Sequence, residues 1–453
     1  MRQVPGVSAA QLMLSIPVIA ALVVVGACSS GDSSNSASTD SPVAGTGTTS
    51  VAVPGTDVAP TGSVVVSMSP DAADAPAYAP ALEASIRAIV EKSTVPSAIV
   101  IVRSGRYGDV TFTSGATELG GSVPVSTTDH ARFGSITKSM TATIILQLVQ
   151  EGLLTLDDPV SKFVPGVPDG DNITVAQLLE MRSGLYSYTN DPTFVRESDA
   201  DLTRPWTPDE LLDLAFAHPA EFPPGSNFQY SNTNYILLGK IMEILTGQTV
   251  QELFQQRLFT PLGMHETTMP GPEDTTPPTP FLHGYHYGSF DKPLPDDEQA
   301  QAAAGSLLPV DQSILNPSWA WTAGSVISTA DDMLIWARAL VDGGLLDPAM
   351  QQVRLDSIQS LGPDFPAAEG KYWYGYGIDR RVTYDGHGGQ INGYNTAVAR
   401  DPATDTDVVV LTTLTLAPDG TSVANALLYG VINGITETDT DVEVPQQTGE
   451  EGP

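Results

Sequence analysis

The 453-residue chain contains one cysteine, Cys28, and few basic side chains. A single cysteine excludes a disulfide within the chain and any zinc or iron–sulfur site built from several cysteines. Lysine and arginine total 20 against 53 aspartates and glutamates, so the formal charge at pH 7 is -33. This excess of negative charge favours solubility and repels phosphate backbones, so we expect no nucleic-acid partner.

The N-terminal segment ends at the single cysteine. Residues 11–27 form an apolar run behind Arg2, with small residues before Cys28, which is the layout of a secretory signal. A transmembrane helix is the alternative, because the run is close to the length that spans a bilayer. The stretch Val25-Gly26-Ala27-Cys28 resembles a bacterial lipoprotein box. That resemblance implies a signal peptide over 1–27, a lipidated Cys28, and an exported protein anchored at the outer face of the cell membrane.

Composition divides the remaining chain into three parts. Residues 28–75 are rich in Ser, Thr, Gly, Ala, Asp and Pro without a sustained apolar period, which predicts a flexible linker. Residues 76–438 have a globular composition and no internal repeat, so we expect them to form one folded domain. Residues 439–453 form an acidic tail that we expect to be disordered.

Hydrophobic periodicity predicts an α+β fold for the globular part: an antiparallel β-sheet flanked by helices, with an inserted mainly helical subdomain. A helix precedes two strands, a long helical region follows, and strands return before a final helix. The predicted helices span 80–92, 135–151, 173–182, 208–217, 234–246, 329–342 and 421–434, and the predicted strands span 99–102, 110–113, 396–398 and 408–414.

The first motif of catalytic type is Ser135-Ile136-Thr137-Lys138, at the start of the predicted helix 135–151. Residues three apart share one face of a helix, and a serine at a helix start has its own N–H free for a developing oxyanion. Lys138 would accept the serine proton only as a neutral amine, which requires desolvation or a neighbouring cation. The alternative is a capping serine beside a solvated lysine. A second match, Ser289 to Lys292, is followed by prolines that disfavour a helix.

Two further motifs have suitable local settings. Tyr230-Ser231-Asn232 follows a Pro-Pro-Gly loop and precedes an amphipathic helix, so a tyrosine for proton transfer and an amide for substrate binding would sit on a rigid element. A similar stretch, Tyr188-Thr189-Asn190, lacks that setting. His387-Gly388-Gly389 lies at the start of a predicted strand, where glycines permit close backbone approach and the histidine would offer a cation or donor to a substrate carboxylate. A buried tyrosine and an exposed histidine turn are the structural alternatives.

The order of these motifs resembles that of the penicillin-recognising serine hydrolases, the DD-peptidase and class C β-lactamase superfamily, over about residues 80–435. Besides the three motifs, the segments ITVAQLLEMRSGL, PLGMHET and AGSVISTADDM carry the resemblance. It implies a β-lactamase/transpeptidase-like fold, with Ser135 as the nucleophile and Lys138 and Tyr230 sharing the proton transfer. Which of the two is the base stays open.

The resemblance also assigns substrate contacts. Asn232 would hold the substrate's amide group, the N–H groups of Ser135 and Gln390 would bind the oxyanion, and the backbone at Gly389 would border the substrate. His387 stands where many relatives have lysine, as in histidine-bearing DD-carboxypeptidases and some esterases. Arg380 and Arg381 lie where similar carboxypeptidases supply an arginine for the terminal carboxylate, although solvated arginines are the alternative.

The implied function is that of a serine hydrolase most like a D-alanyl-D-alanine carboxypeptidase, with no cofactor and no metal. Its substrate would be a peptidoglycan stem peptide, a β-lactam or a small ester, so an esterase or a β-lactamase is the alternative. A lipoprotein that senses β-lactams or peptidoglycan without turnover is a further one. The chain lacks the G-x-S-x-G motif of α/β-hydrolases. Neither the acyl donor nor the oligomeric state is indicated by the sequence.

Overall fold

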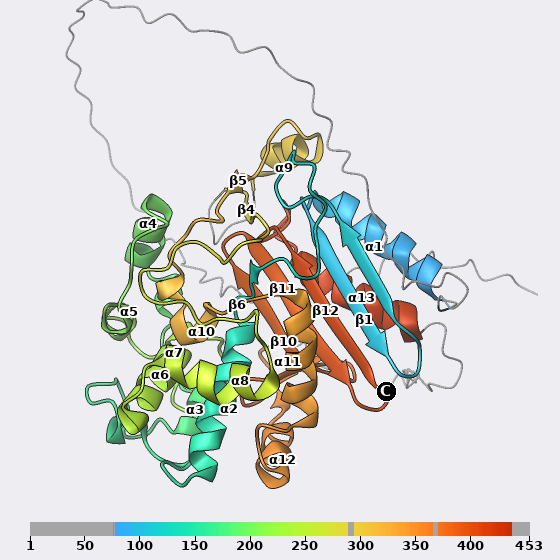
Figure 1. Ribbon diagram of the computed structural model, residues 1–453. Helices are drawn as coiled ribbons and strands as arrows, with labels where there is room; N and C mark the ends of the chain where they lie inside the picture. The colour runs from blue at the N-terminus through green and yellow to red at the C-terminus, as the bar shows by residue number, and fades with distance from the viewer. Residues whose placement is uncertain (1–75, 77, 289–293, 366–369, 437–453) are drawn as a thin grey trace, which may run out of the picture.

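An antiparallel sheet of eight strands forms the centre of the molecule (Figure 1). The computed structural model describes residues 76, 78–288, 294–365 and 370–436, so Cys28, Ser289, Lys292 and the predicted tail lie outside the described residues. The strands are β1 (Ala98–Ser104), β2 (Val110–Ser114), β7 (Gln359–Ser360), β8 (Tyr372–Tyr374), β9 (Asp379–Arg381), β10 (Tyr384–Ile391), β11 (Tyr394–Asp401) and β12 (Thr406–Thr412). Their order is β2-β1-β12-β11-β10-β9-β8-β7. The predicted α+β class is confirmed.

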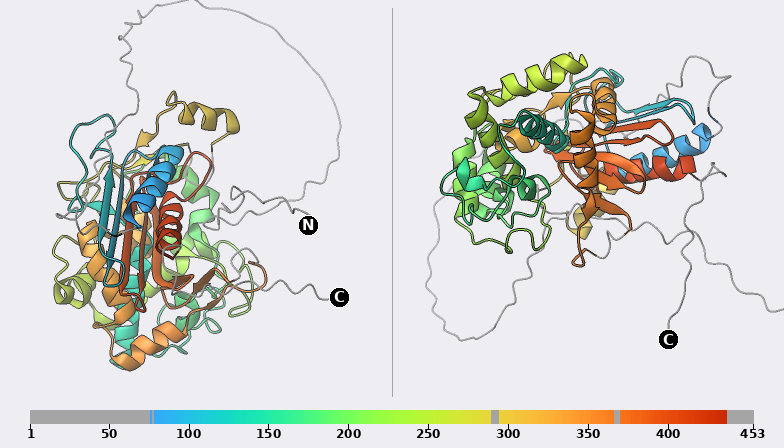
Figure 2. Two further views of the ribbon diagram at one scale, coloured as in Figure 1. Left: turned by 90° about the vertical axis from the view of Figure 1, so that its right-hand side faces the viewer. Right: turned by 90° about the horizontal axis from the view of Figure 1, so that it is seen from below.

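The sheet separates two hydrophobic cores, because successive strand residues point to opposite faces. Val100 and Val102 of β1 pack with helices α1 (Ala79–Ser93) and α13 (Val423–Thr436), which lie together on one face (Figures 1 and 2). Ile99 and Ile101 of the same strand belong to the larger core on the other face. Helix α11 (Ala330–Asp342) contacts β11 and β12 there, and α2 (Ile136–Gln150) contacts β10 and β11.

The inserted subdomain is mainly helical and lies beside the sheet (Figure 1). It contains helix α2 and the segments that follow it. Those segments are α3 (Val175–Leu179), α4 (Pro192–Ala200), α5 (Pro208–Phe216), α6 (Asn232–Thr246), α7 (Val250–Phe254) and α8 (Thr260–Leu262), with the short helices η1 (Val160–Lys162), η2 (Tyr188–Asn190) and η3 (Gln255–Phe259).

Further short elements connect this subdomain to the final strands. They include α9 (Asp296–Ala303), η4 (Pro317–Trp319), α10 (Trp321–Gly324) and α12 (Pro348–Asp356). Two small two-stranded sheets join β3 (Ala131–Arg132) to β6 (Ile327–Ser328) and β4 (Tyr285–His286) to β5 (Val310–Asp311). Within the described ranges, no helix combines the length and apolar character needed to cross a bilayer.

Most predicted elements are present, and one predicted helix is shorter than expected. The helix predicted over 173–182 is α3, which ends at Leu179 because Met181 adopts a left-handed backbone conformation with φ of 62°. Its start is fixed by a capping box between Thr174 and Gln177. The short strands β7, β8 and β9 had no counterpart in the sequence prediction.

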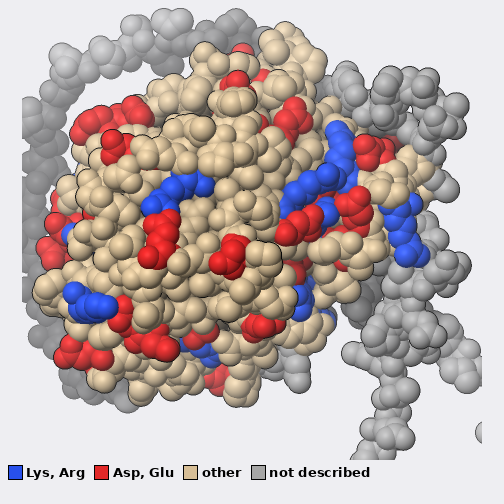
Figure 3. All heavy atoms as spheres, turned by 60° about the horizontal axis from the view of Figure 1, so that its bottom comes forward, with Lys and Arg blue, Asp and Glu red and all other residues tan. Residues whose placement is uncertain are grey.

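Charged side chains of both signs are interspersed on the surface. On the face shown in Figure 3, basic side chains lie next to acidic ones. Ion pairs such as Arg257–Glu151 and Arg380–Asp385 also join side chains of opposite sign. The net negative charge is therefore not relieved by a broad basic patch on that face.

Candidate active site

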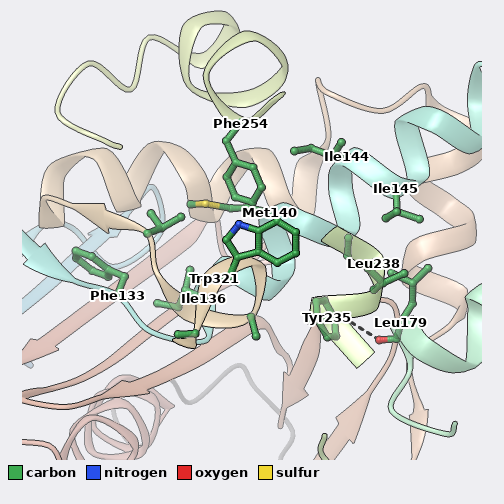
Figure 4. Close-up of a cluster of buried hydrophobic side chains, with 14 of the residues drawn as sticks. Phe133, Ile136, Met140, Ile144, Ile145, Leu179, Tyr235, Leu238, Phe254 and Trp321 are labelled. Carbon is green, nitrogen blue, oxygen red and sulfur yellow. Dashed lines mark hydrogen bonds between the residues drawn. The ribbon is translucent and has the colours of Figure 1, made fainter. Parts of the chain in front are cut away.

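Ser135 lies at the N-terminus of α2 with its side chain available for chemistry. It makes no capping hydrogen bond, which argues against the capping alternative. Among residues 131–140 it alone is partly exposed, whereas its neighbours are buried. The helix is held in place by a packed apolar core in which Ile136 and Met140 face Trp321 and Phe254 (Figure 4). A rigid helix start therefore presents one accessible hydroxyl.

Lys138 lies one helical turn further on and is fully buried. Its Nζ is 2.9 Å from Ser135 Oγ, 2.7 Å from Asn232 Oδ1 and 2.6 Å from the Ala323 carbonyl oxygen. Burial lowers the pKa of Lys138 well below its ordinary value. A neutral amine has two hydrogens and one lone pair. The amide and carbonyl oxygens accept the two hydrogens, which leaves the lone pair for the proton of Ser135.

Tyr230 lies on the other side of the same amine, two residues before α6 begins. Lys138 Nζ is 4.8 Å from the centre of the Tyr230 ring. Burial raises the pKa of Tyr230, while a hydrogen bond with Ser135 opposes that rise. The phenol is therefore protonated at neutral pH, and it contacts the same hydroxyl as the lysine.

Asn232 is the first residue of α6 and is held from both ends of its amide. Its Oδ1 accepts from Lys138, and its Nδ2 donates to Thr189 Oγ1 at 3.3 Å. Its backbone N–H donates to Ser187 Oγ at 3.1 Å. The second tyrosine–asparagine stretch is thus a neighbour of the site, with Tyr188 buried and its hydroxyl donating to the Trp319 carbonyl oxygen.

Strand β10 supplies an open edge beside the nucleophile. Its pairing with β9 ends at Gly386, which lies opposite Asp379, so residues from His387 onward have no strand on that side in the described sheet. The Gly388 N–H contacts the Asp379 carboxylate and therefore points to this edge. Because backbone N–H directions alternate along a strand, the Gln390 N–H points to the same edge.

Two glycines bring this strand close to the nucleophile. A Cβ at Gly134, whose φ is 55°, would lie 2.7 Å from the Gln390 nitrogen. A Cβ at Gly389 would lie 2.0 Å from the Phe133 carbonyl oxygen. Gly389 therefore allows β10 to lie close to the backbone at Phe133. The sequence instead predicted that the absence of a side chain at this position would make room for the substrate. The result places Ser135 and the backbone of Gln390 together.

The sequence predicted a cation or a hydrogen-bond donor at His387, and the geometry of the imidazole favours neither role toward a substrate. It is buried, and burial lowers its pKa to about 3. Nδ1 lies 2.6 Å from the Gly388 carbonyl oxygen, an acceptor, so Nδ1 carries the proton. Nε2 is then free to accept from the Tyr374 hydroxyl at 3.0 Å. The imidazole is a neutral, fixed part of the site wall.

Arg380 and Arg381 are both engaged by carboxylates. Arg380 forms a two-point ion pair with Asp385, at 2.6 and 2.8 Å. Arg381 is buried and pairs with Asp379 at 2.7 Å. Each arginine therefore has an acidic partner within the fold, so the structure does not favour the expectation that they offer charge to a substrate carboxylate.

Three contributors to the site were missed by sequence reasoning. Tyr374 binds His387, and its ring centre lies 6.3 Å from that of Tyr230. The Ala323 carbonyl binds Lys138 from the segment AGSVISTADDM, in which the family resemblance was already noted. Asp379 contacts the open edge of β10. The aromatic and glycine run from Tyr372 to Gly377 was the available signal for Tyr374.

Comparisons with known proteins agree with this geometry. The family model described as Beta-lactamase matches residues 82–429. Penicillin-binding protein 4 of Amycolatopsis lactamdurans is 30% identical over 238 residues, covering 51% of this chain and 56% of that protein. Putative penicillin-binding protein PbpX of Bacillus subtilis is 26% identical over 242 residues, covering 53% and 54%. The chain thus spans about half the length of these curated relatives.

Solved structures match over more of their length. A D-stereospecific amidohydrolase from Streptomyces sp. has a TM-score of 0.64 and 31% identity, covering 77% of this chain and 98% of that one. The D-amino acid amidase from Ochrobactrum anthropi has a TM-score of 0.65 and 26% identity, covering 78% and 99%. With the serine, lysine and tyrosine assembled as described, the chain belongs to the beta-lactamase family of serine acyl-enzyme hydrolases and penicillin-binding proteins.

Proposed function

We propose that this protein hydrolyses an amide bond in a small D-amino-acid-derived substrate through an acyl-enzyme on Ser135. The contact between Ser135 and the buried Lys138 carries the proposal, because only a neutral amine there can take the hydroxyl proton. The D-alanyl-D-alanine carboxypeptidase expected from the sequence is one member of this class. The amidohydrolase and amidase relatives support the class through the activities for which they are named, and the penicillin-binding relatives support peptidoglycan-like or β-lactam acyl donors.

The proposed reaction follows from the positions of the protons. The Ser135 hydroxyl proton moves to Lys138 Nζ as Oγ bonds to the substrate carbonyl carbon. The N–H groups of Ser135 and Gln390 stabilise the oxyanion. As the carbon–nitrogen bond breaks, Tyr230 donates its proton to the leaving nitrogen and regains one from Lys138. Water then attacks the ester carbonyl, and its proton returns to Ser135 through the same groups.

The opposite pKa shifts of the two neighbours support this division of labour. Burial lowers the pKa of Lys138 and raises that of Tyr230. The amine is therefore suited to accept the first proton, and the phenol still carries its proton when the strongly basic leaving nitrogen needs one. A fixed Asn232 amide beside them would hold the amide group of the acyl portion.

Covalent labelling tests the assignment of the nucleophile. Ser135→Ala should abolish labelling by a fluorescent penicillin and by a fluorophosphonate, because no other hydroxyl contacts Lys138 Nζ among the described residues. Ser289→Ala, in the second S-x-x-K match, should leave labelling intact. The reverse pattern would overturn the proposed nucleophile.

Turnover separates the enzyme from a sensor of the same family. The chain from residue 76 onward is incubated with a D-alanyl-D-alanine peptide, a short-chain ester and a cephalosporin. Steady turnover of an amide substrate is the expected result. A burst equal to the enzyme concentration, without further turnover of any of the three, would favour the sensor instead.

We also propose that the protein is exported and lipid-anchored through Cys28. The apolar run at 11–27 and the lipoprotein-like box before Cys28 support this proposal. Replacing Cys28→Ala in the full chain should release the protein from the membrane fraction and stop incorporation of a labelled fatty acid. Membrane association that survives the substitution together with an uncleaved N-terminus would favour a transmembrane helix.

A further inference from the structure

We infer that Asp379 occupies the position where the open edge of β10 would otherwise bind a substrate carboxylate, so that the enzyme prefers substrates with an uncharged leaving group. The inference rests on the proposed function and narrows its substrate class to carboxamides, esters and internal peptide bonds. Four sets of observations support it.

The first concerns the location of Asp379. The Gly388 N–H at the open edge of β10 contacts its carboxylate. Gln390, whose N–H would bind the oxyanion, is two residues further along the same edge, a separation of about 7 Å in an extended strand. A terminal carboxylate one residue beyond the scissile carbonyl would reach this part of the edge, and the carboxylate of Asp379 already contacts its donor.

The second observation identifies this side of the cleft as the leaving-group side. Burial raises the pKa of Tyr230, which would protonate the leaving nitrogen, and the negative charge of Asp379 adds to that rise. Tyr374 contacts both Tyr230 and β10, since its ring lies edge-on to Tyr230 and its hydroxyl binds His387 of that strand. The leaving group would therefore depart between Tyr230 and the part of β10 that contacts Asp379.

The third observation is that Asp379 is a fixed component of the fold. Its side chain is 2% exposed, and its Oδ2 is 2.7 Å from Arg381 Nη2 and 3.3 Å from the Tyr372 hydroxyl. Arg381 lies against Gly388, where a Cβ would be 2.7 Å from its Nη2. The positive charge nearest this edge is therefore neutralised by the protein's own carboxylate.

The fourth observation is that other candidates for binding an anion are also occupied. His387 is uncharged, and both of its ring nitrogens have partners. Arg380 is held by Asp385. Lys138 is buried and serves the nucleophile. Among the residues described around this edge, none of these groups presents an unpaired positive charge to a leaving group.

The test compares two substrates that differ only at the terminus, N-acetyl-D-alanyl-D-alanine and its C-terminal amide. For the wild-type chain we expect kcat/KM for the amide to exceed that for the acid by at least about tenfold, because a second carboxylate would meet Asp379 in a weakly screened site. As a measurement independent of turnover, the amide should protect Ser135 from fluorophosphonate at a lower concentration than the acid. Equal use of acid and amide, or preference for the acid, would overturn the inference.

Asp379→Asn supplies the matched variant. It removes the charge, keeps an oxygen for the Gly388 N–H, and leaves Arg381 unpaired, so the acid-to-amide ratio of kcat/KM should rise by at least about tenfold. Asp385→Asn is the control, since it neutralises another buried carboxylate paired with an arginine on β9 and should leave the ratio unchanged. If Asp379→Asn lowers kcat/KM equally for both substrates and leaves their ratio unchanged, Asp379 has only a structural role and the inference is overturned.

The two proposals fail in different ways. If Ser135 is not labelled and no amide, ester or β-lactam is turned over, the proposed function fails and the inference fails with it. If Ser135 is acylated and turns over but shows no preference for the uncharged terminus, only the inference fails.

Discussion

Lys138 and His387 show how burial decides the chemistry of a single side chain. Both are enclosed by the protein, and desolvation lowers both pKa values. Lys138 retains a lone pair directed at a hydroxyl, so losing its proton makes it a base. His387 has both nitrogens engaged, so losing its proton makes it a neutral structural contact. The partner atoms, rather than the residue types, separate the two roles.

Replacing Lys138→Ala should slow acylation by at least about a hundredfold, the low end for losing a positioned base. In the wild type the acylation rate should fall as pH drops through the lowered pKa of Lys138, because the protonated amine has no lone pair. The acylation rate of the Lys138→Ala variant should not show this fall with decreasing pH. Rates of labelling by fluorescent penicillin from pH 5 to 10 measure both effects.

Lys240→Ala is the control for this experiment. Lys240 lies on α6 and pairs with Asp209 at the surface, so its removal should leave the rate and the pH profile unchanged. An unchanged acylation rate in Lys138→Ala would remove the lysine from its assigned role.

Tyr374 should behave as a positioning residue for His387. Tyr374→Phe removes the donor to Nε2 and leaves that nitrogen buried without its partner, which costs about 1–3 kcal/mol of folding free energy. The pKa of His387 should rise, because the hydrogen bond stabilised its neutral form. Denaturant unfolding measures the first effect, and a titration of the imidazole resonances by NMR measures the second.

A histidine titration that does not move in Tyr374→Phe would show that the hydroxyl does not control the imidazole. Tyr376→Phe provides the comparison, since Tyr376 follows Tyr374 by two residues beyond the end of β8, and the hydroxyl and ring that contact His387 belong to Tyr374. It should leave the histidine titration unchanged.

At the scale of elements, long patterned segments were predictable and short paired ones were not. Helix α2 was predicted because its apolar residues recur with helical spacing and Gly152 follows its end. Strands β8 and β9 have three residues each and exist through pairing with β7 and β10. Periodicity cannot be recognised in three residues. The elements that carry Tyr374 and Asp379 were therefore invisible before the fold was known.

Helices α6 and α10 are tightly packed at Gly239, and α10 also contributes to the site. A Cβ at Gly239 would lie 2.4 Å from Thr322 Oγ1 and 2.6 Å from the Trp321 ring. Gly239→Ala should therefore destabilise the protein by about 1–3 kcal/mol, the usual cost of overpacking a core. It should also slow acylation, because α10 contains Ala323, whose carbonyl oxygen binds Lys138. Denaturant unfolding and labelling rates measure the two effects.

Gly434→Ala distinguishes crowding from helix propensity. Gly434 lies within α13, where a Cβ would be 3.4 Å from Leu82 Cδ1, an ordinary contact. Alanine there should stabilise the protein by about 0.5–1 kcal/mol and leave acylation unchanged. If Gly239→Ala and Gly434→Ala change the free energy of unfolding and the acylation rate equally, the packing argument is contradicted.

At the scale of the whole molecule, the site combines segments separated by hundreds of residues. Ser135 and Lys138 come from one helix, Tyr230 from the loop before another, and His387 from a late strand. Sequence reasoning identified these residue types because each occupies a recognisable local setting. It could not identify the partners of Arg380 and Arg381. The pairing of Arg380 with Asp385 depends on the register of β9 and β10, and that of Arg381 with Asp379 depends on both lying in the three-residue strand β9.

The net charge of the molecule should affect its reactions at a distance. With a formal charge of -33 and acidic side chains interspersed over the face in Figure 3, the protein repels anionic acyl donors before they reach the cleft. The screening length falls from about 30 Å at 0.01 M salt to about 8 Å at 0.15 M. Raising the salt should therefore increase the second-order rate constant for acylation by a cephalosporin carboxylate by about threefold or more. The neutral p-nitrophenyl acetate should react at a nearly constant rate, because it feels no such repulsion. A cephalosporin rate that falls with salt would mean that a local positive potential at the cleft outweighs the overall charge, and would also weaken the assignment of Asp379.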